Sequence, residues 1–157
     1  PQGWQHQIKN DVVVNYEVGF EKELLQYCKF FSLQSQATAR VGTLFTNASA
    51  GLNAVVGIVD SPFEKVETNK KFQVYLYAQP LVNAIGYDAT LQGGLFNKSS
   101  PYTIASGEIE RITGQVNYGI VFKMSSLYLE YFRSSLTREF DSGSSASWGG
   151  IRIGFKI

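Results

Sequence analysis

The chain has 157 residues, a length typical of one domain, and a formal net charge of +1. Fourteen basic residues balance thirteen acidic ones, so no basic excess favours nucleic acid as a partner. Aromatic residues reach 14% of the chain, which gives it enough apolar surface to fold. One cysteine and one histidine exclude an intrachain disulfide framework and a cysteine-rich zinc site.

Strands are the dominant secondary structure that the sequence predicts. No run of about 18 apolar residues is present, so no transmembrane helix is expected. Apolar and polar residues instead alternate along nearly the whole chain, as they do in β-strands. We expect strands within 12–20, 32–41, 52–58, 72–79, 87–95, 111–122, 127–140 and 150–157. This gives seven or eight strands, depending on whether 30–58 holds one interrupted strand or two.

The connections between these strands differ in length. Residues 60–71 and 97–107 are long and polar, 141–147 is rich in Gly and Ser, and 123–126 is a tight turn. Alternating long and short connections are typical of an outer-membrane barrel. The window 21–29 holds the best helix-forming residues, but we interpret it as a strand end and turn. A change of phase near Phe132 predicts a bulge or an interfacial end.

The two phases of the alternation indicate which face meets which solvent. The polar phase consists mostly of Gln, Asn, Thr, Ser and Gly, without the dense charge of a solvated strand. Such side chains can satisfy one another inside a narrow lumen, and the apolar phase then faces lipid. We therefore predict an all-β fold, a transmembrane antiparallel β-barrel of the bacterial outer membrane. A soluble barrel or sandwich is the alternative.

The last ten residues, Trp148 to Ile157, form an alternating strand that is apolar at every second position. This pattern resembles the terminal signal that the bacterial barrel-assembly machinery recognises, so that machinery is an expected partner. The usual last residue of the signal is Phe, and Ile157 departs from it. Phe155, two positions earlier, partly restores the pattern.

Four segments resemble one family, in family order and over essentially the whole chain. Residues 1–11 read PQGWQHQIKND, and they are followed by a Gly-Thr…Gly stretch at 42–51, YDATLQGG at 87–94 and TREF at 137–140. These segments are similar to the conserved boxes of the lipid A 3′-O-deacylases of the outer membrane. The resemblance implies a barrel of about twelve strands. We interpret residues 1–157 as a single β-barrel domain that forms its C-terminal half.

The resemblance also implies an activity, the removal of the 3′-acyloxyacyl chain from lipid A. In this family Ca²⁺ is thought to polarise the ester carbonyl while a histidine activates water, which combines Lewis-acid and general-base catalysis. Ca²⁺ takes several oxygen ligands. Lipid A, the lipid anchor of lipopolysaccharide, is then the expected membrane partner.

The family's metal motif and catalytic histidine precede the Gly-Trp box, so we expect this chain to lack both and predict no metal site within it. His6 lies inside the box and is the candidate catalytic base; an interfacial or turn histidine is the alternative. The candidate substrate-binding residues are Trp4, Gln7, Asn10, Asp11 and Arg138.

Two sets of charged residues have alternative roles. The acidic set could touch a cation or form a solvated strand end, and comprises Asp11, Glu17, Glu21 and Glu23. The arginine set could bind lipid phosphates or form lumen ion pairs, and comprises Arg111, Arg133, Arg138 and Arg152. The candidate partners of those ion pairs are Glu110, Glu130 and Glu139. Two functions therefore remain open: a lipid A esterase, and a non-catalytic barrel that serves as scaffold or subunit of a larger outer-membrane complex.

Overall fold

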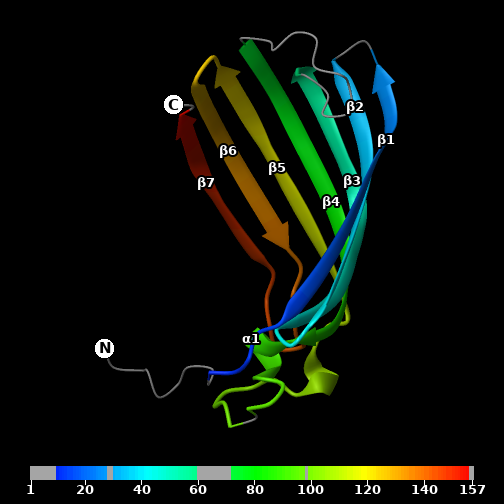
Figure 1. Ribbon diagram of the computed structural model, residues 1–157, viewed down its shortest axis with the longest axis vertical. Helices are drawn as coiled ribbons and strands as arrows, with labels where there is room; N and C mark the ends of the chain where they lie inside the picture. The colour runs from blue at the N-terminus through cyan, green and yellow to red at the C-terminus, as the bar shows by residue number, and fades with distance from the viewer. Residues whose placement is uncertain (1–9, 28–29, 60–71, 98, 156–157) are drawn as a thin grey trace.

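A computed structural model describes residues 10–27, 30–59, 72–97 and 99–155 of the chain. These residues form seven strands, a short α-helix and a 3₁₀ turn (Figure 1). The elements are β1 (Asn15–Tyr27), β2 (Phe31–Gly42), β3 (Phe45–Ile58), β4 (Phe72–Asp88), α1 (Ala89–Gln92), η2 (Ser106–Glu108), β5 (Ile112–Met124), β6 (Leu127–Leu136) and β7 (Ala146–Phe155). None of the helices in these ranges is long and apolar enough to cross a membrane.

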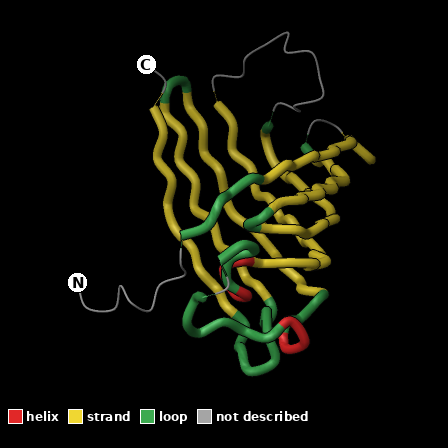
Figure 2. The backbone as a smooth tube through the Cα atoms, turned by 60° about the horizontal axis from the view of Figure 1, so that its bottom comes forward, coloured by secondary structure: helices red, strands yellow, loops and turns green. Residues whose placement is uncertain are grey.

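All seven strands lie in one antiparallel sheet whose spatial order is the order of the sequence. The sheet curves into an open trough, with β1 and β7 at its two edges (Figure 2). The all-β prediction is confirmed, and the strand count is seven. The segment 30–58 holds two strands, β2 and β3, joined at Thr43 and Leu44.

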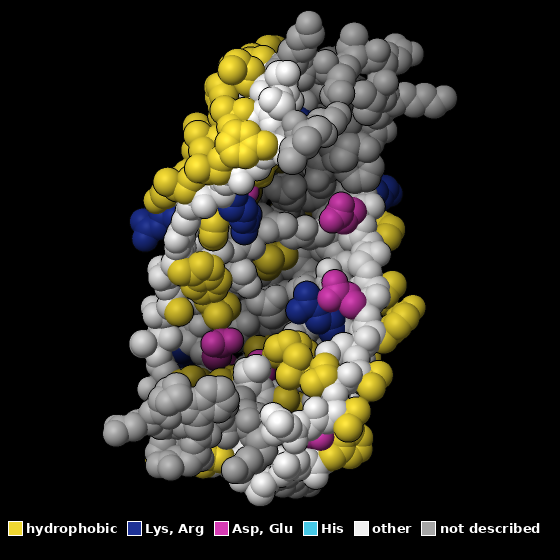
Figure 3. Space-filling view, turned by 60° about the vertical axis from the view of Figure 1, so that its left-hand side comes forward, with side chains coloured by type: hydrophobic (Ala, Val, Ile, Leu, Met, Phe, Trp, Pro, Cys, Tyr) yellow, Lys and Arg dark blue, Asp and Glu magenta, His cyan; other side chains and the backbone are white. Residues whose placement is uncertain are grey.

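The trough has a polar concave face and an apolar outward face. Along β5 the concave positions include Thr113 and Val121, both buried, whereas Ile120 between them is 44% exposed. Figure 3 looks into the trough, where acidic and basic side chains line the hollow. The exposed outward side chains include Tyr16, Val18, Phe20, Ile120, Ile151, Ile153 and Phe155. The predicted division between polar interior and apolar exterior is therefore confirmed.

Strand β1 confirms that the window 21–29 contains a strand end. It continues to Tyr27, and the register shifts between Glu23 and Leu25. The window with helix-forming residues is thus extended, because pairing with β2 outweighs local helix propensity. The bulge at Leu24 absorbs one residue and keeps the apolar Leu25 on the outward face opposite Leu33.

Strand β4 corrects the prediction of separate strands at 72–79 and 87–95. One strand runs through Pro80 to Asp88, and the following residues form α1 instead of a strand. Proline has no N–H to give to a ladder. Accordingly, the β3–β4 register passes from the Gly51–Leu81 pair to the Ala54–Ala78 pair without a pair at Pro80.

The phase change at Phe132 is not a bulge. The β5–β6 and β6–β7 registers run without a shift through this residue. Phe132 instead faces the hollow, where the Arg152 guanidinium carbon lies 4.1 Å above its ring centroid. The cation on the aromatic face explains why an apolar residue occupies the polar phase.

The two ends of the trough carry different connections. The end with the Ser125–Ser126 turn is here called the turn end, and the end with α1 and η2 the loop end (Figure 1). Long connections occur at both: 59–71 joins β3 to β4 at the turn end, and 89–111 joins β4 to β5 at the loop end. The predicted alternation of long loops on one side with short turns on the other therefore holds only in part.

Candidate functional site

The β4–β5 connection, 89–111, is the centre of the loop end. The segment before β1 and the segment after β6 both hydrogen-bond to it. Ala89 also donates its N–H to the carbonyl of Leu44 in the β2–β3 turn, at 2.9 Å. Most of the site candidates that the structure describes therefore lie around one connection.

Asp11 anchors this connection through its carboxylate. One oxygen, Oδ2, accepts the backbone N–H groups of Phe96 at 2.9 Å and Asn97 at 3.2 Å, and Oδ1 accepts that of Val12 at 2.8 Å. A Cβ atom on Gly94 would lie 2.2 Å from Oδ2, so glycine is needed for this approach. The Phe96 N–H lowers the pKa of Asp11, because it stabilises the charged form.

Asn10 joins Asp11 on the same part of the connection. Its backbone carbonyl accepts from the side-chain amide of Asn97 at 3.3 Å. The Asn97 oxygen in turn accepts from the N–H and hydroxyl of Ser99, as in an Asx turn. Two predicted substrate-binding residues thus lie side by side, and in this structure they order a loop.

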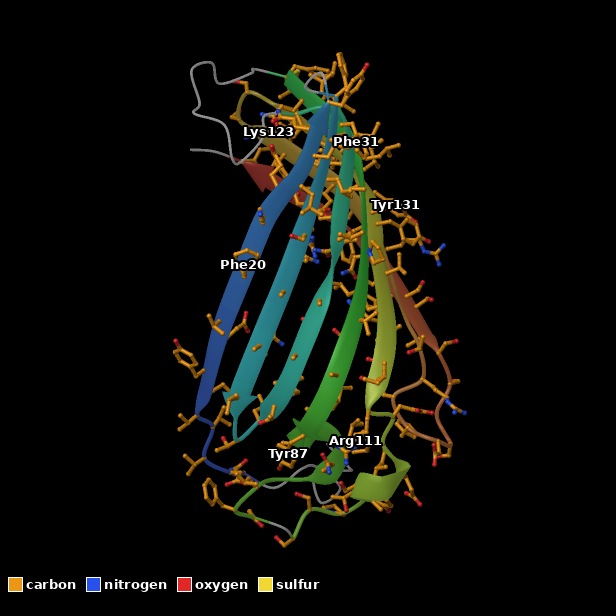
Figure 4. All side chains as sticks on the ribbon, turned by 90° about the vertical axis from the view of Figure 1, so that its right-hand side faces the viewer. Phe20, Phe31, Tyr87, Arg111, Lys123 and Tyr131 are labelled. Carbon is orange, nitrogen blue, oxygen red and sulfur yellow. The ribbon has the colours of Figure 1, made fainter. Side chains whose placement is uncertain are left out.

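The start of the connection is held from β4. Asp88 caps α1 by accepting the Thr90 N–H at 2.8 Å, and the Tyr87 hydroxyl donates to the Gly93 carbonyl at 2.6 Å. Gly93 has a φ of 83°, which favours glycine. Tyr87 and Arg111 both lie at this end, far from Phe31 and Lys123 at the turn end (Figure 4).

Arginines hold the end of the connection. Arg111 donates to the carbonyls of Gly86 and Ser106, each at 2.7 Å. Arg138, the third described substrate-binding candidate, pairs with Glu110 at 2.6 Å. Arg138 therefore contacts a different part of the connection from Asn10 and Asp11.

Glu139 follows Arg138 at the loop end, and from the sequence we considered it only as a possible partner in an ion pair. Burial raises the pKa of its carboxyl, and the charge of Asp88 raises it further. Perturbed carboxyl groups of this kind occur in functional sites and in structural ion-pair networks. In the sequence, Glu139 could have been identified from its place in TREF, one of the four segments that resemble the family.

The hollow contains a second group, here called the inner cluster: Tyr77, Tyr128, Glu130 and Arg152. Glu130 has a side chain only 5% exposed, and its carboxylate accepts the Tyr77 hydroxyl at 2.7 Å, the Tyr128 hydroxyl at 2.8 Å and Arg152 at 2.9 Å. Tyr77, Tyr128 and Glu130 also line a cavity of about 430 Å³ within the hollow. The Glu130–Arg152 pair confirms one of the predicted lumen ion pairs.

A row of polar side chains crosses the concave face nearer the loop end. The Gln79 amide donates to Gln36 at 2.9 Å, Asn117 donates to Gln79 at 2.9 Å, and Ser134 donates to Asn117 at 2.6 Å. Gln36 of β2 and Gln79 of β4 thus reach each other across β3, where Gly51 is the residue paired with Gln36. Buried side-chain polar atoms without a partner are absent from the part of the chain that the structure describes.

The remaining candidates are less informative. Trp4, His6 and Gln7 lie outside the described residues. Within the described ranges, no three His, Cys, Asp or Glu side chains are grouped so that they could hold a metal ion. Glu17 of the acidic set is paired with Arg40 instead.

Comparison with known proteins places the chain in a family. The family model described as outer membrane protein LpxR matches residues 1–157. Among solved structures, LpxR from Salmonella typhimurium is similar, with a TM-score of 0.72 and 19% identity. The match covers 98% of this chain and 55% of that one, so the chain spans about half the length of its structural relative. No curated protein matches. The chain belongs to the outer membrane protein LpxR family, and its seven strands are part of an outer-membrane β-barrel.

Proposed function

We propose that the full-length protein containing this chain is a lipid A 3′-O-deacylase, an esterase that hydrolyses the 3′-acyloxyacyl chain. The family match over residues 1–157 carries this proposal. In it, the chain supplies one wall of the barrel and the ordered loop end beside the lipid. Lipid A and lipopolysaccharide are the proposed substrate class, and the barrel-assembly machinery is a proposed partner in insertion.

The hydrogen bonds of the loop end support this proposal. A positioned catalytic group needs a fixed frame, because small displacements of reacting atoms cost rate. Asp11, Tyr87 and Arg111 each bind backbone atoms of the 86–106 region and would provide such a frame. Arg138 would have to exchange Glu110 for a lipid phosphate in order to bind substrate.

His6 is the proposed general base within this chain, because an imidazole ionises near neutral pH. Trp4 and Gln7, in the same box, are the proposed substrate contacts. A calcium requirement belongs to the full-length protein in this proposal, with ligands other than the described residues.

The test uses the full-length protein in cells that lack other lipid A esterases. Mass spectrometry of extracted lipid A should show loss of the 3′ chain, and chelation of Ca²⁺ should prevent that loss. His6→Gln should reduce the rate about 10²–10⁴-fold if His6 is the base. An unaffected His6→Gln variant would assign that role to another histidine. Intact lipid A beside a correctly folded barrel would instead favour the non-catalytic scaffold.

A further inference from the structure

Arg133 lies on the outward face of β6. It pairs in register with Tyr118 of β5 and Gly149 of β7, and it alternates with Phe132 and Ser134 on the concave side. A Cβ atom on Gly149 would lie 3.1 Å from the Arg133 Cγ. The side chain of Arg133 therefore extends over the glycine, on the face that meets lipid.

On β6 and β7, the outward residues change from apolar to polar at Arg133. From the turn end, the outward residues of β6 and β7 are first apolar: Leu127, Leu129, Tyr131, Phe155, Ile153 and Ile151. The next outward positions toward the loop end hold Arg133, then Ser135 and Ser147, whose hydroxyls are 2.9 Å apart. Such a boundary on a barrel wall marks the level at which hydrocarbon meets the lipid headgroups.

The other arginines already have partners. Arg40, Arg138 and Arg152 form ion pairs with glutamates, and Arg111 donates to backbone carbonyls. Arg133 has no hydrogen bond or ion pair within the part of the chain that the structure describes. Arg133 is exposed, so at the headgroup level its guanidinium is free to pair with an anionic group of the surroundings.

We propose that Arg133 binds the phosphate of an outer-membrane lipid at the loop-end boundary of the wall. A guanidinium forms paired hydrogen bonds with phosphate oxygens. Tyr118 and Tyr131, 40% and 48% exposed, flank it on outward positions, and tyrosine favours this interfacial level. The apolar strip of Ile151 and Ile153 beside it accommodates acyl chains, so the ligand is a lipid phosphate and not the free ion. This site is on the outer wall and goes beyond the proposed esterase function.

The test measures lipid binding to the purified, delipidated full-length protein by native mass spectrometry. The probes are dipalmitoyl phosphatidic acid, dipalmitoylglycerol and inorganic phosphate. The variants are Arg133→Gln, Arg133→Lys and a control, Lys22→Gln. Lys22 of β1 also lies outward, where it pairs with Ser35 of β2, but it is on the turn-end side of Phe20. Heat-modifiability first confirms that each variant is folded.

We expect Arg133→Gln to weaken phosphatidic acid binding about tenfold, as for loss of a charge-assisted hydrogen bond. Arg133→Lys should retain part of the affinity because it keeps the charge, and Lys22→Gln should bind as the wild type does. Equal binding of the two lipids, an unchanged Arg133→Gln variant, or displacement of the lipid by millimolar inorganic phosphate would each overturn the proposal. If Arg133→Gln fails to fold, the phosphatidic acid affinities of Arg133→Lys and Lys22→Gln are compared instead. The proposal requires Arg133→Lys to bind phosphatidic acid more weakly than Lys22→Gln does.

Discussion

The two faces of this sheet are built from alternate residues of the same strands, yet they are stabilised differently. On the concave face, Glu130 has three side-chain partners and Asn117 has three. On the outward face, Phe20, Ile120 and Ile153 are exposed apolar side chains. Polar groups away from bulk water need specific partners, whereas apolar groups in lipid need only to remain apolar. Substitutions should therefore fail on the two faces for different reasons.

The largest effect is expected from a charge on the outward face. Ile120→Arg, at the middle of β5 between Leu76 and Tyr131, should destabilise the barrel by about 2–4 kcal/mol, the cost of arginine at the bilayer midplane. Urea unfolding of the full-length protein in lipid vesicles measures it. Ile120→Leu is the control and should stay within about 1.5 kcal/mol of the wild type. Equal stability of the two variants would contradict a lipid-facing Ile120.

Removal of Glu130 should have a somewhat smaller effect on the concave face. Glu130→Ala leaves Tyr77, Tyr128 and Arg152 without their shared acceptor, which should cost about 2–3 kcal/mol in the same assay. The double variant Glu130→Gln/Arg152→Gln should recover part of this loss, because the amides can still bond to each other and to the hydroxyls. A double variant less stable than Glu130→Ala would refute the account of the inner cluster.

Asp11→Asn tests the loop end, which belongs to neither face of the sheet. The amide retains one oxygen but loses the charge that holds the Phe96 and Asn97 N–H groups. Hydrogen exchange of these two amides should accelerate several-fold, with the strands unchanged, since loops open locally. The Gly93 amide, bonded to the Ala89 carbonyl, is an internal control and should keep its rate.

The same contact should respond to acid. The Phe96 N–H lowers the pKa of Asp11 in the folded protein below its ordinary value of 3.8. Its stabilising contribution is therefore complete above pH 3.8 and is lost as the pH falls through the lower, folded-state pKa. NMR titration of the Phe96 and Asn97 amide shifts should show a midpoint below 3.8. A midpoint above that value, or the same titration in Asp11→Asn, would disprove this assignment.

The smallest effect is expected for the exposed pair at the loop end. The Arg138 side chain is 56% exposed, so its ion pair with Glu110 is screened by water. A double-mutant cycle with Arg138→Gln and Glu110→Gln should give a coupling of about 0.2–1 kcal/mol. A coupling energy as large as the effect of Glu130→Ala would mean that water screens the Arg138–Glu110 pair as little as it screens the inner cluster.

The alternation of residue types predicted the sheet and its two faces, because a period of two is a direct geometric consequence of a strand. The alternation does not continue through 21–27, although the window 21–29 was correctly interpreted as containing a strand end; there, pairing with β2 holds helix-forming residues extended. The alternation could not predict the continuity of β4 through Pro80, because β5 continues the pairing there although β3 does not.

The site was harder to predict from the sequence than the fold was. Asn10, Asp11 and Arg138 were chosen from boxes of a family, and the structure shows what each contacts at the loop end. The Glu130–Arg152 pair followed from charges in the polar phase, but the two tyrosines did not. Tyr77 reaches Glu130 from β4, which is distant in sequence, and Tyr128 lies two residues before Glu130 on β6, where alternation shows the shared face but not the hydrogen bond. The outward position of Arg133 required the register, because Phe132 interrupts the pattern around it.

The Ser125–Ser126 turn has a consequence for the order in which the strands come together. It joins β5 to β6 across two residues, whereas 23 residues, 89–111, separate β4 from β5. Closing the longer connection costs about 2 kcal/mol more chain entropy, since the cost grows with the logarithm of loop length. The β5–β6 hairpin should thus form early and offer β6 as a template for β7. Ser125, at a φ of 49°, adopts a left-handed conformation within this turn, so Ser125→Gly should accelerate that nucleation step.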